Sequence, residues 1–329
     1  MVGVVVMAGG KSQRNLMEIV RDAVAYPFMK AAEFIGGYSF EVPIQGYKPI
    51  RKVKGDIDGI IKERPMITYV INRLVKARNV EQIVLVGEEK ILNKSLKENL
   101  PNEDYGIFES IGRVVQQAGD FRANSCKGYA NLPKHVLDSS RGYALFMFSD
   151  AVNCTSNGIA RFIEESREKD ADIILGIATK NQLKGYKKYF PRPAFELVDD
   201  INFSKEDRDE DGLVGLRSAD RIYANPLKIN NPELIDEIFK FRRLAKMIVH
   251  PKELFNLKKR LNINFKEYYS KYRSKTLALS EVLQKASREL GAKISILKVE
   301  DAQCSLDLDA ERDIPASERM NYELNHRTK

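Results

Sequence analysis

Five short, almost wholly apolar stretches recur along the chain, and they are the feature that most restricts its fold. They are residues 4–7, 83–87, 143–148, 172–178 and 293–299. Amphipathic stretches such as 66–79 and 155–169 lie between several of them, with apolar residues at helical spacing. Apolar strands that alternate with helices are typical of a mostly parallel sheet covered on both faces. We therefore expect an α/β fold with a Rossmann-like, mixed but mostly parallel sheet.

The composition of the chain argues against several classes of protein. It has 329 residues and three cysteines without a CxxC pair or an HExxH motif, so neither a disulfide framework nor a zinc site is expected. No apolar run approaches the roughly 20 residues of a membrane span, and the first run is too short for a signal peptide. We expect a cytoplasmic protein. The net charge of +8 is spread out, which favours small phosphorylated ligands over a specific nucleic-acid partner.

The chain is expected to form one domain over residues 1–329 that carries insertions. Residues 15–47 are one insertion. Residues 186–229 are another, with the pattern of a hairpin and an acidic, solvated loop. Residues 232–290 are almost wholly helical in pattern and rich in Lys and Arg. We expect this basic helical segment to be a lid or dimerisation element packed on the sheet. A homodimer is therefore one possible assembly.

The first apolar run ends in the sequence AGGKSQR, residues 8–14. Its spacing does not match the GxxxxGK[ST] motif, because residue 5 is valine, and it does not match the GxGxxG fingerprint. Glycines let backbone N–H groups approach an anion closely, and Lys11 and Arg14 add positive charge. The loop therefore predicts a phosphate site. A tight turn with two surface cations is the alternative.

AGGKSQR resembles the LAGG-x-S-x-R loop of the nucleotidyltransferases with a glycosyltransferase-A-like fold. That superfamily includes molybdenum-cofactor guanylyl- and cytidylyltransferases and sugar-1-phosphate nucleotidyltransferases. The resemblance implies that the loop wraps the base, ribose and triphosphate of a nucleoside triphosphate (NTP). The nucleotide-binding residues that it implies are Ala8, Gly9, Gly10, Lys11, Ser12, Arg14 and Lys48. Of these, Lys11, Arg14 and Lys48 are implied to be catalytic, because they would neutralise charge on the leaving pyrophosphate.

Lys48 lies in a second stretch that is similar to the same family. YKPIRKV at 47–53, followed by ERPMITYVINRL at 63–74, resembles K-P-L-x-x-V … x-P-M-I-x-x-V-x-x-L. Lys48 takes the place of the family's phosphate-binding lysine. The chain departs from the family in spacing, because more residues than usual separate Arg14 from Lys48 and the two halves of this segment from each other. A surface lysine is the alternative for Lys48.

Two further stretches resemble the segments that carry the family's metal ligands. LFMFSDAVNCTSNGIARFIEE at 145–165 resembles the strand–Asp–x–x–helix segment, which implies that Asp150 holds Mg²⁺; a carboxylate at the end of a buried strand suits a hard cation. SLDLDAERDI at 305–314 resembles D-[IV]-D-T-P-E-D-L, which implies Asp309 or Asp307 as the second ligand, on a strand. The alternatives are that Asp150 caps the next helix and that Asp309 begins an acidic helix.

The four stretches together imply a Mg²⁺-dependent nucleotidyltransferase that joins an NTP to a phosphorylated acceptor, such as a sugar phosphate or cofactor precursor, and releases pyrophosphate. Two alternatives stay open: an NDP-sugar glycosyltransferase, although that class lacks the glycine loop, and a non-catalytic nucleotide-binding protein of the same fold. Base choice is expected to depend on backbone near Gly9 and on a loop near 116–124. The acceptor pocket is expected to use segment 179–229, including Lys184, Lys187, Lys188, Arg192 and Asn225.

Overall fold

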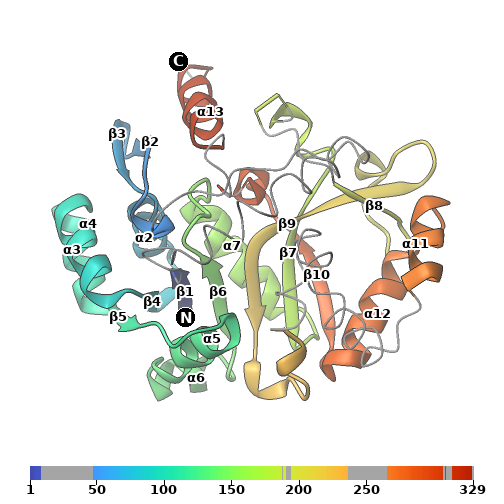
Figure 1. Ribbon diagram of the computed structural model, residues 1–329, viewed down its shortest axis with the longest axis horizontal. Coiled ribbons are helices and arrows are strands. Elements are labelled where there is room, and N and C mark those ends of the chain that lie inside the picture. The colour runs from blue at the N-terminus through green and yellow to red at the C-terminus, as the bar shows by residue number, and fades with distance from the viewer. Residues whose placement is uncertain are drawn as a thin grey trace, which may run out of the picture.

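The computed structural model describes residues 1–8, 47–186, 188–189, 194–235, 265–306, 308 and 313–327. Within these ranges, an eight-stranded sheet forms the centre of the molecule and helices pack on both of its faces (Figure 1). A separate hairpin of two strands, β2 and β3, stands beside it. The expected α/β class with a mostly parallel sheet is confirmed. No helix in the described ranges has the length and apolar character needed to cross a membrane.

The strand order across the sheet is β10-β7-β9-β6-β1-β4-β5, and β8 pairs with β9. β9 runs antiparallel to its three neighbours, and the other neighbouring strands pair in parallel. The strands are β1 (Val2–Ala8), β2 (Lys52–Ile57), β3 (Ile60–Pro65), β4 (Val80–Gly87), β5 (Gly112–Gln116), β6 (Ala144–Phe148), β7 (Ile173–Thr179), β8 (Phe195–Val198), β9 (Leu213–Ala224) and β10 (Ile294–Lys298). The five apolar stretches of the sequence are therefore β1, β4, β6, β7 and β10.

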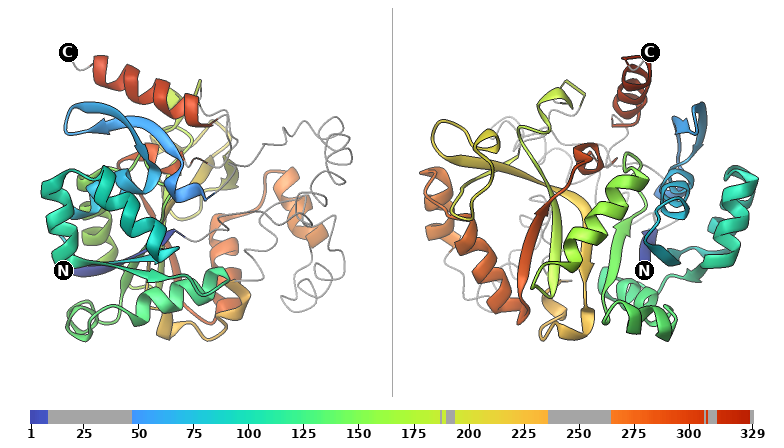
Figure 2. Two further views of the ribbon diagram at one scale, coloured as in Figure 1. Left: turned by 60° about the vertical axis from the view of Figure 1, so that its left-hand side comes forward. Right: turned by 180° about the vertical axis from the view of Figure 1, so that it is seen from behind.

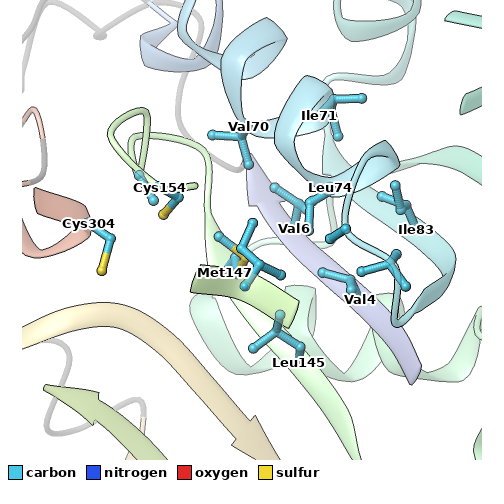
Figure 3. Close-up of a cluster of buried hydrophobic side chains, with 14 of the residues drawn as sticks. Val4, Val6, Val70, Ile71, Leu74, Ile83, Leu145, Met147, Cys154 and Cys304 are labelled. Carbon is cyan, nitrogen blue, oxygen red and sulfur yellow. The ribbon is translucent and has the colours of Figure 1, made fainter. Parts of the chain in front are cut away.

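Alternate residues of β1 reach opposite faces of the sheet, so the strand is buried on both sides. Val4 and Val6 join the core under α2, α3 and α7, where Val70 and Leu74 lie beside them (Figure 3). Val5 joins the opposite core with residues of α5 and α12. The helices are α2 (Met66–Val75), α3 (Glu89–Asn99), α4 (Asn102–Ile111), α5 (Phe121–Ala130), α6 (Lys134–Ser139), α7 (Ser156–Arg167), α11 (Phe265–Arg273), α12 (Leu279–Leu290) and α13 (Asp313–Arg327).

The insertions are only partly described. Residues 15–47 lie outside the described residues except for Tyr47. In 186–229, β8 and β9 form the expected antiparallel pair, and β9 continues into the central sheet. In 232–290, α11 and α12 are helical as expected, and residues 236–264 lie outside the described residues. The β2–β3 hairpin was not expected, although Asp58-Gly59, both with positive φ, is a recognisable hairpin turn.

One expectation about a strand is wrong. The stretch 305–309 was expected to be extended, but Ser305 ends a 3-10 turn (Ala302–Ser305), and Leu306 and Leu308 belong to no strand. This turn follows β10 and Asp301. Leu306 and Leu308 are nevertheless buried, in a core with Val152. Leu306 and Leu308 therefore pack the stretch against the loop that follows β6.

A buried ion pair ties three parts of the fold together. Arg221 of β9 is fully buried and donates to both carboxylate oxygens of Asp301, at 2.8 and 2.5 Å. Asp301 also accepts from the backbone N–H of Thr155, at 2.8 Å, and from its hydroxyl. A Cβ on Gly158 would lie 2.2 Å from Cγ of Asp301, so α7 can approach this closely only with glycine there. Breaking the pair would leave a buried charge without its counterpart.

Asp301→Asn is expected to destabilise the protein strongly. The substitution keeps the side-chain volume but leaves the guanidinium of Arg221 buried without a counter-charge, which costs about 3–5 kcal/mol. Urea unfolding followed by circular dichroism measures the change. The matched control is Glu164→Gln, because Glu164 also pairs with an arginine, Arg78, but at the surface. Equal and small losses for the two variants would contradict a structural role for the Arg221–Asp301 pair.

Candidate active site at the carboxyl ends of β1 and β6

The strand order of the sheet changes direction beside β1. From β1 the sheet extends through β4 and β5 on one side, and β6 then returns to pair with β1 on the other. Ligands in open α/β sheets bind outside the carboxyl ends of the strands at such a point. β1 ends at Ala8 and β6 at Phe148, with Met7 paired to Phe148. Asp150 therefore lies at the edge from which the AGGKSQR loop leaves.

Lys48 and Asp150 meet at this edge although 102 residues separate them. The ammonium nitrogen Nζ of Lys48 contacts Oδ2 of Asp150, and their side chains are 25% and 15% exposed. Lys48 begins a short 3-10 turn (Lys48–Ile50), which lies after the first insertion and before β2. The structure thus brings together two of the residues that the sequence singled out. Lys48 is not an isolated surface lysine.

The helix after Asp150 has its own cap. The hydroxyl of Thr155 accepts a hydrogen bond from the backbone N–H of Gly158 at 3.0 Å, which makes Thr155 the N-cap of α7. Asp150 lies five residues earlier and is left to face Lys48. The alternative in which Asp150 caps the helix is therefore wrong.

The C-terminal stretch comes to the same loop. The side-chain amide of Asn153 donates to the carbonyl of Leu306 at 2.9 Å, and its oxygen lies 3.1 Å from the hydroxyl of Ser317. The backbone at Leu306 is thereby held by Asn153, which follows Asp150 by three residues. Asp307 and Asp309 themselves lie outside the described residues. In the part of the chain that is described, no group of three His, Cys, Asp or Glu side chains is placed to hold a metal ion.

The glycine loop is described only at its first residue. Ala8 is fully buried at the end of β1, and its carbonyl accepts a hydrogen bond from the hydroxyl of Tyr47. The other predicted nucleotide-binding residues of the loop lie outside the described residues: Gly9, Gly10, Lys11, Ser12 and Arg14.

Sequence reasoning missed two features of this region. Tyr47 was read only as the residue before Lys48, and its hydroxyl contacts two strand ends. Cys154 and Cys304, scattered in the sequence, are both buried in one core (Figure 3). Arg221 and Asp301 lie near both cysteines. For Tyr47, an aromatic residue at the end of an insertion was the available signal. Nothing in the spacing of the cysteines pointed to their shared location.

The expected role of Asn225 in the acceptor pocket is wrong. Asn225 follows β9, and its amide donates to the carbonyl of Arg141 at 3.2 Å, ahead of the start of β6. Because β9 runs antiparallel to β6, its carboxyl end lies at the amino ends of the parallel strands. Asn225 is therefore at the edge opposite Asp150, where it caps a 3-10 turn (Pro226–Lys228).

One of the expected acceptor-side cations, Lys188, contacts α13. Lys184 is in a 3-10 turn (Lys184–Tyr186), whereas Lys187 and Arg192 lie outside the described residues. Lys188 and the hydroxyl of Tyr189 both bind the carboxylate of Glu323 in α13, each at 2.5 Å. Figure 2 shows α13 beside the β2–β3 hairpin, where Glu318 accepts from the backbone N–H of Lys54 at 2.8 Å. α13 therefore links the hairpin to the segment that carries Lys188.

The Glu323 contacts predict an unusually acidic carboxyl group. Hydrogen bonds from Lys188 and Tyr189 lower the pKa of Glu323 from its ordinary value of 4.5 to about 2. Because the folded-state pKa is the lower one, the stabilising contribution is present above pH 4.5 and is lost as the pH falls toward 2. A carbon-13 NMR titration should show a midpoint near 2, and Lys188→Met should move it upward. A wild-type midpoint near 4.5 would mean that α13 is not held by these contacts.

Comparison with known proteins bears on the fold. No protein-family model and no curated protein sequence matches the chain. Among solved structures, a hypothetical transferase from Thermus thermophilus superposes with a TM-score of 0.56 at 16% identity, over 95% of this chain and 99% of the other. A 4-diphosphocytidyl-2C-methyl-D-erythritol synthase from Anaerococcus prevotii gives a TM-score of 0.45 at 10% identity, over 97% and 95%. A nucleotidyl transferase from Methanothermobacter gives 0.41 at 11% identity, over 100% and 99%. At the level of the fold, the chain is thus built like the transferase from Thermus thermophilus.

Proposed function

We propose that the protein is a Mg²⁺-dependent nucleotidyltransferase that joins an NTP to a phosphorylated acceptor and releases pyrophosphate. The observation that carries the proposal is the meeting of Lys48 and Asp150 at the carboxyl ends of the strands. An ammonium group and a carboxylate, both partly exposed, lie where β1 leads into a glycine loop with two further cations. The phosphates of an NTP bound at this edge need cationic partners, and its metal ion needs a carboxylate.

The residues of the chain act in this reaction by binding and charge neutralisation. A phosphate oxygen of the acceptor attacks the α-phosphorus in line, and the bond to the pyrophosphate breaks. Lys11, Arg14 and Lys48 are proposed to neutralise the negative charge on the leaving pyrophosphate, and the backbone of Gly9 and Gly10 to hold the nucleotide. No covalent nucleophile of the protein is required, because the acceptor supplies the attacking oxygen.

The carboxylate of Asp150 has the chemistry of a magnesium ligand. Asp150 supplies a partly exposed carboxylate, which suits a hard cation, and Asp307 or Asp309 is proposed as the second ligand. When bound, Mg²⁺ would neutralise phosphate charge and orient the triphosphate. The contact with Asp150 places the ammonium group of Lys48 beside the carboxylate that is proposed to hold the metal ion, and so near the phosphates that the ion would bind.

Two other functions remain as alternatives, and one measurement separates them from the proposal. An NDP-sugar glycosyltransferase would bind the sugar nucleotide and release no pyrophosphate, and a nucleotide-binding protein would bind an NTP without turnover. The first step is a thermal-shift panel of the four NTPs, each with Mg²⁺. A screen of sugar phosphates and other phosphorylated acceptors then follows pyrophosphate release with the NTP that binds. Binding without pyrophosphate release for any acceptor would favour the non-catalytic alternative.

Asp150→Asn is expected to abolish Mg²⁺-dependent pyrophosphate release while the protein stays folded. The substitution removes a ligand charge for the metal, but the ion pair that it breaks is only partly buried and is worth up to about 1 kcal/mol. Melting temperature and pyrophosphate release are measured on the same sample. Asp307→Asn and Asp309→Asn, made in parallel, identify the second ligand as the one whose loss also abolishes turnover. Near-normal turnover of Asp150→Asn would exclude the proposed metal role.

Lys11→Ala and Arg14→Ala are each expected to weaken NTP binding or slow transfer. Each removes one charge-assisted contact to phosphate, worth roughly 1.5–3 kcal/mol, which corresponds to about 10- to 150-fold. Isothermal titration calorimetry and pyrophosphate release measure the two effects. Lys94→Ala, at an exposed position of α3, is the matched control for loss of a single positive charge. If both loop variants behave like the control, AGGKSQR is a plain turn.

A further inference from the structure

Tyr47 places a buried phenol directly under the candidate site. Its hydroxyl donates to the carbonyl of Ala8 at 2.6 Å and accepts from the backbone N–H of Glu88 at 2.7 Å. Ala8 ends β1 and Glu88 follows the end of β4, so one hydroxyl joins the carboxyl ends of two neighbouring strands. Only 5% of the residue is exposed. It thereby gives a partner to the carbonyl of Ala8, where the glycine loop begins, and to the backbone amide of Glu88, directly after β4.

The phenol of Tyr47 lies in close contact with the backbone at the end of β4. A Cβ on Gly87 would lie 2.3 Å from the Tyr47 hydroxyl oxygen, so glycine at the end of β4 is what allows the ring to be seated there. Burial raises the pKa of Tyr47, which keeps the hydroxyl neutral and able to donate and accept at once. A buried hydroxyl that bridges a carbonyl and an amide is expensive to lose, because both partners would be left unsatisfied.

The backbone of Tyr47 connects this anchor to Lys48. The carbonyl of Tyr47 accepts from the N–H of Ile50 at 3.1 Å, which closes the turn that begins with Lys48. Arg51, at the end of that turn, accepts from the N–H of Met66 at 3.0 Å and so joins the turn to the start of α2. The turn is thus fixed to the sheet on one side by the Tyr47 side chain and to α2 on the other. Lys48 projects from it toward Asp150.

We propose that Tyr47 is a positioning residue of the site, which sets the place of Lys48 relative to Asp150. A role of this positioning in catalysis rests on the proposed function. The position of Lys48 relative to Asp150 can be tested in the protein without ligand. A lysine side chain has four rotatable carbon–carbon bonds and loses considerable freedom when it is held in one place. An anchored turn also fixes the backbone from which this side chain extends. Less conformational entropy is then lost when the ammonium group of Lys48 binds a phosphate.

Tyr47→Phe tests the proposal because it removes only the hydroxyl and keeps the buried ring. The matched control is Tyr129→Phe. Tyr129 is also buried, and its hydroxyl donates to the carbonyl of Gly142 at 2.8 Å, at the amino-end edge of the sheet. A second test variant, Gly87→Ala, keeps Tyr47 but puts a Cβ 2.3 Å from its hydroxyl oxygen, and also 2.5 Å from the side chain of Leu92 and 2.8 Å from the carbonyl oxygen of Ala8. If one test variant fails to fold, the other still displaces the anchor.

Two measurements follow each variant. The first is the rate of reductive methylation of Lys48 in the ligand-free protein, by peptide mass spectrometry with exposed Lys94 as internal reference. The second is the affinity for whichever Mg²⁺–NTP complex the wild-type protein binds. We expect Tyr47→Phe and Gly87→Ala to raise the Lys48 rate at least threefold and to weaken NTP binding at least fivefold. Tyr129→Phe also removes a buried hydroxyl, but far from Lys48, and should change neither.

The two readouts separate failure of the inference from failure of the proposed function. Unchanged methylation of Lys48 in both test variants would overturn the positioning role and leave Tyr47 as a purely structural tyrosine. Absence of binding of any NTP to the wild-type protein would count against the proposed function, while the methylation rates would still decide the placement of Lys48. Faster methylation with wild-type NTP affinity would also overturn the inference, because the placement would then have no part in binding.

Discussion

The buried pair of Arg221 and Asp301 is the interaction on which the arrangement of the site depends. A guanidinium inside the core is tolerated only with a carboxylate beside it, so β9 and the chain after β10 must come together at this point. Asp301 also binds the start of α7, which follows the Asp150 loop. A single carboxylate therefore holds the C-terminal stretch, with Leu306 and Leu308, close to the end of β6.

The other side of the site is held by neutral hydrogen bonds rather than by charge. Tyr47 joins the ends of β1 and β4 and closes the turn that carries Lys48. Lys48 contacts Asp150. Asp150 therefore lies between the contacts made by Asp301 and those made by Tyr47. Lys48 and Asp150 are thus partly exposed, while Tyr47, Arg221 and Asp301 are buried.

Much of the fold could be predicted from the sequence, and the failures have a common origin. The apolar runs located β1, β4, β6, β7 and β10, and the amphipathic stretches located α2 and α7. Asn225 was misplaced because an apolar run does not reveal the direction of its strand, and β9 is antiparallel. The stretch 305–309 was expected to be extended, but Leu306 and Leu308 belong to no strand and pack against the loop after β6. In each case the missing information was which neighbour the segment packs against.

The sequence by itself determined where strands and helices lie and which charged residues follow strand ends, because apolar periodicity, glycines and caps act over a few neighbouring residues. It therefore pointed to Lys48 and Asp150 separately. Only the tertiary structure decided that they touch, that Tyr47 anchors the turn before them, and that Cys154 and Cys304 share the core beside Arg221. Those contacts join segments far apart in the chain, and they follow from the pairing order of the strands and from the need of every buried charge and hydroxyl for a partner.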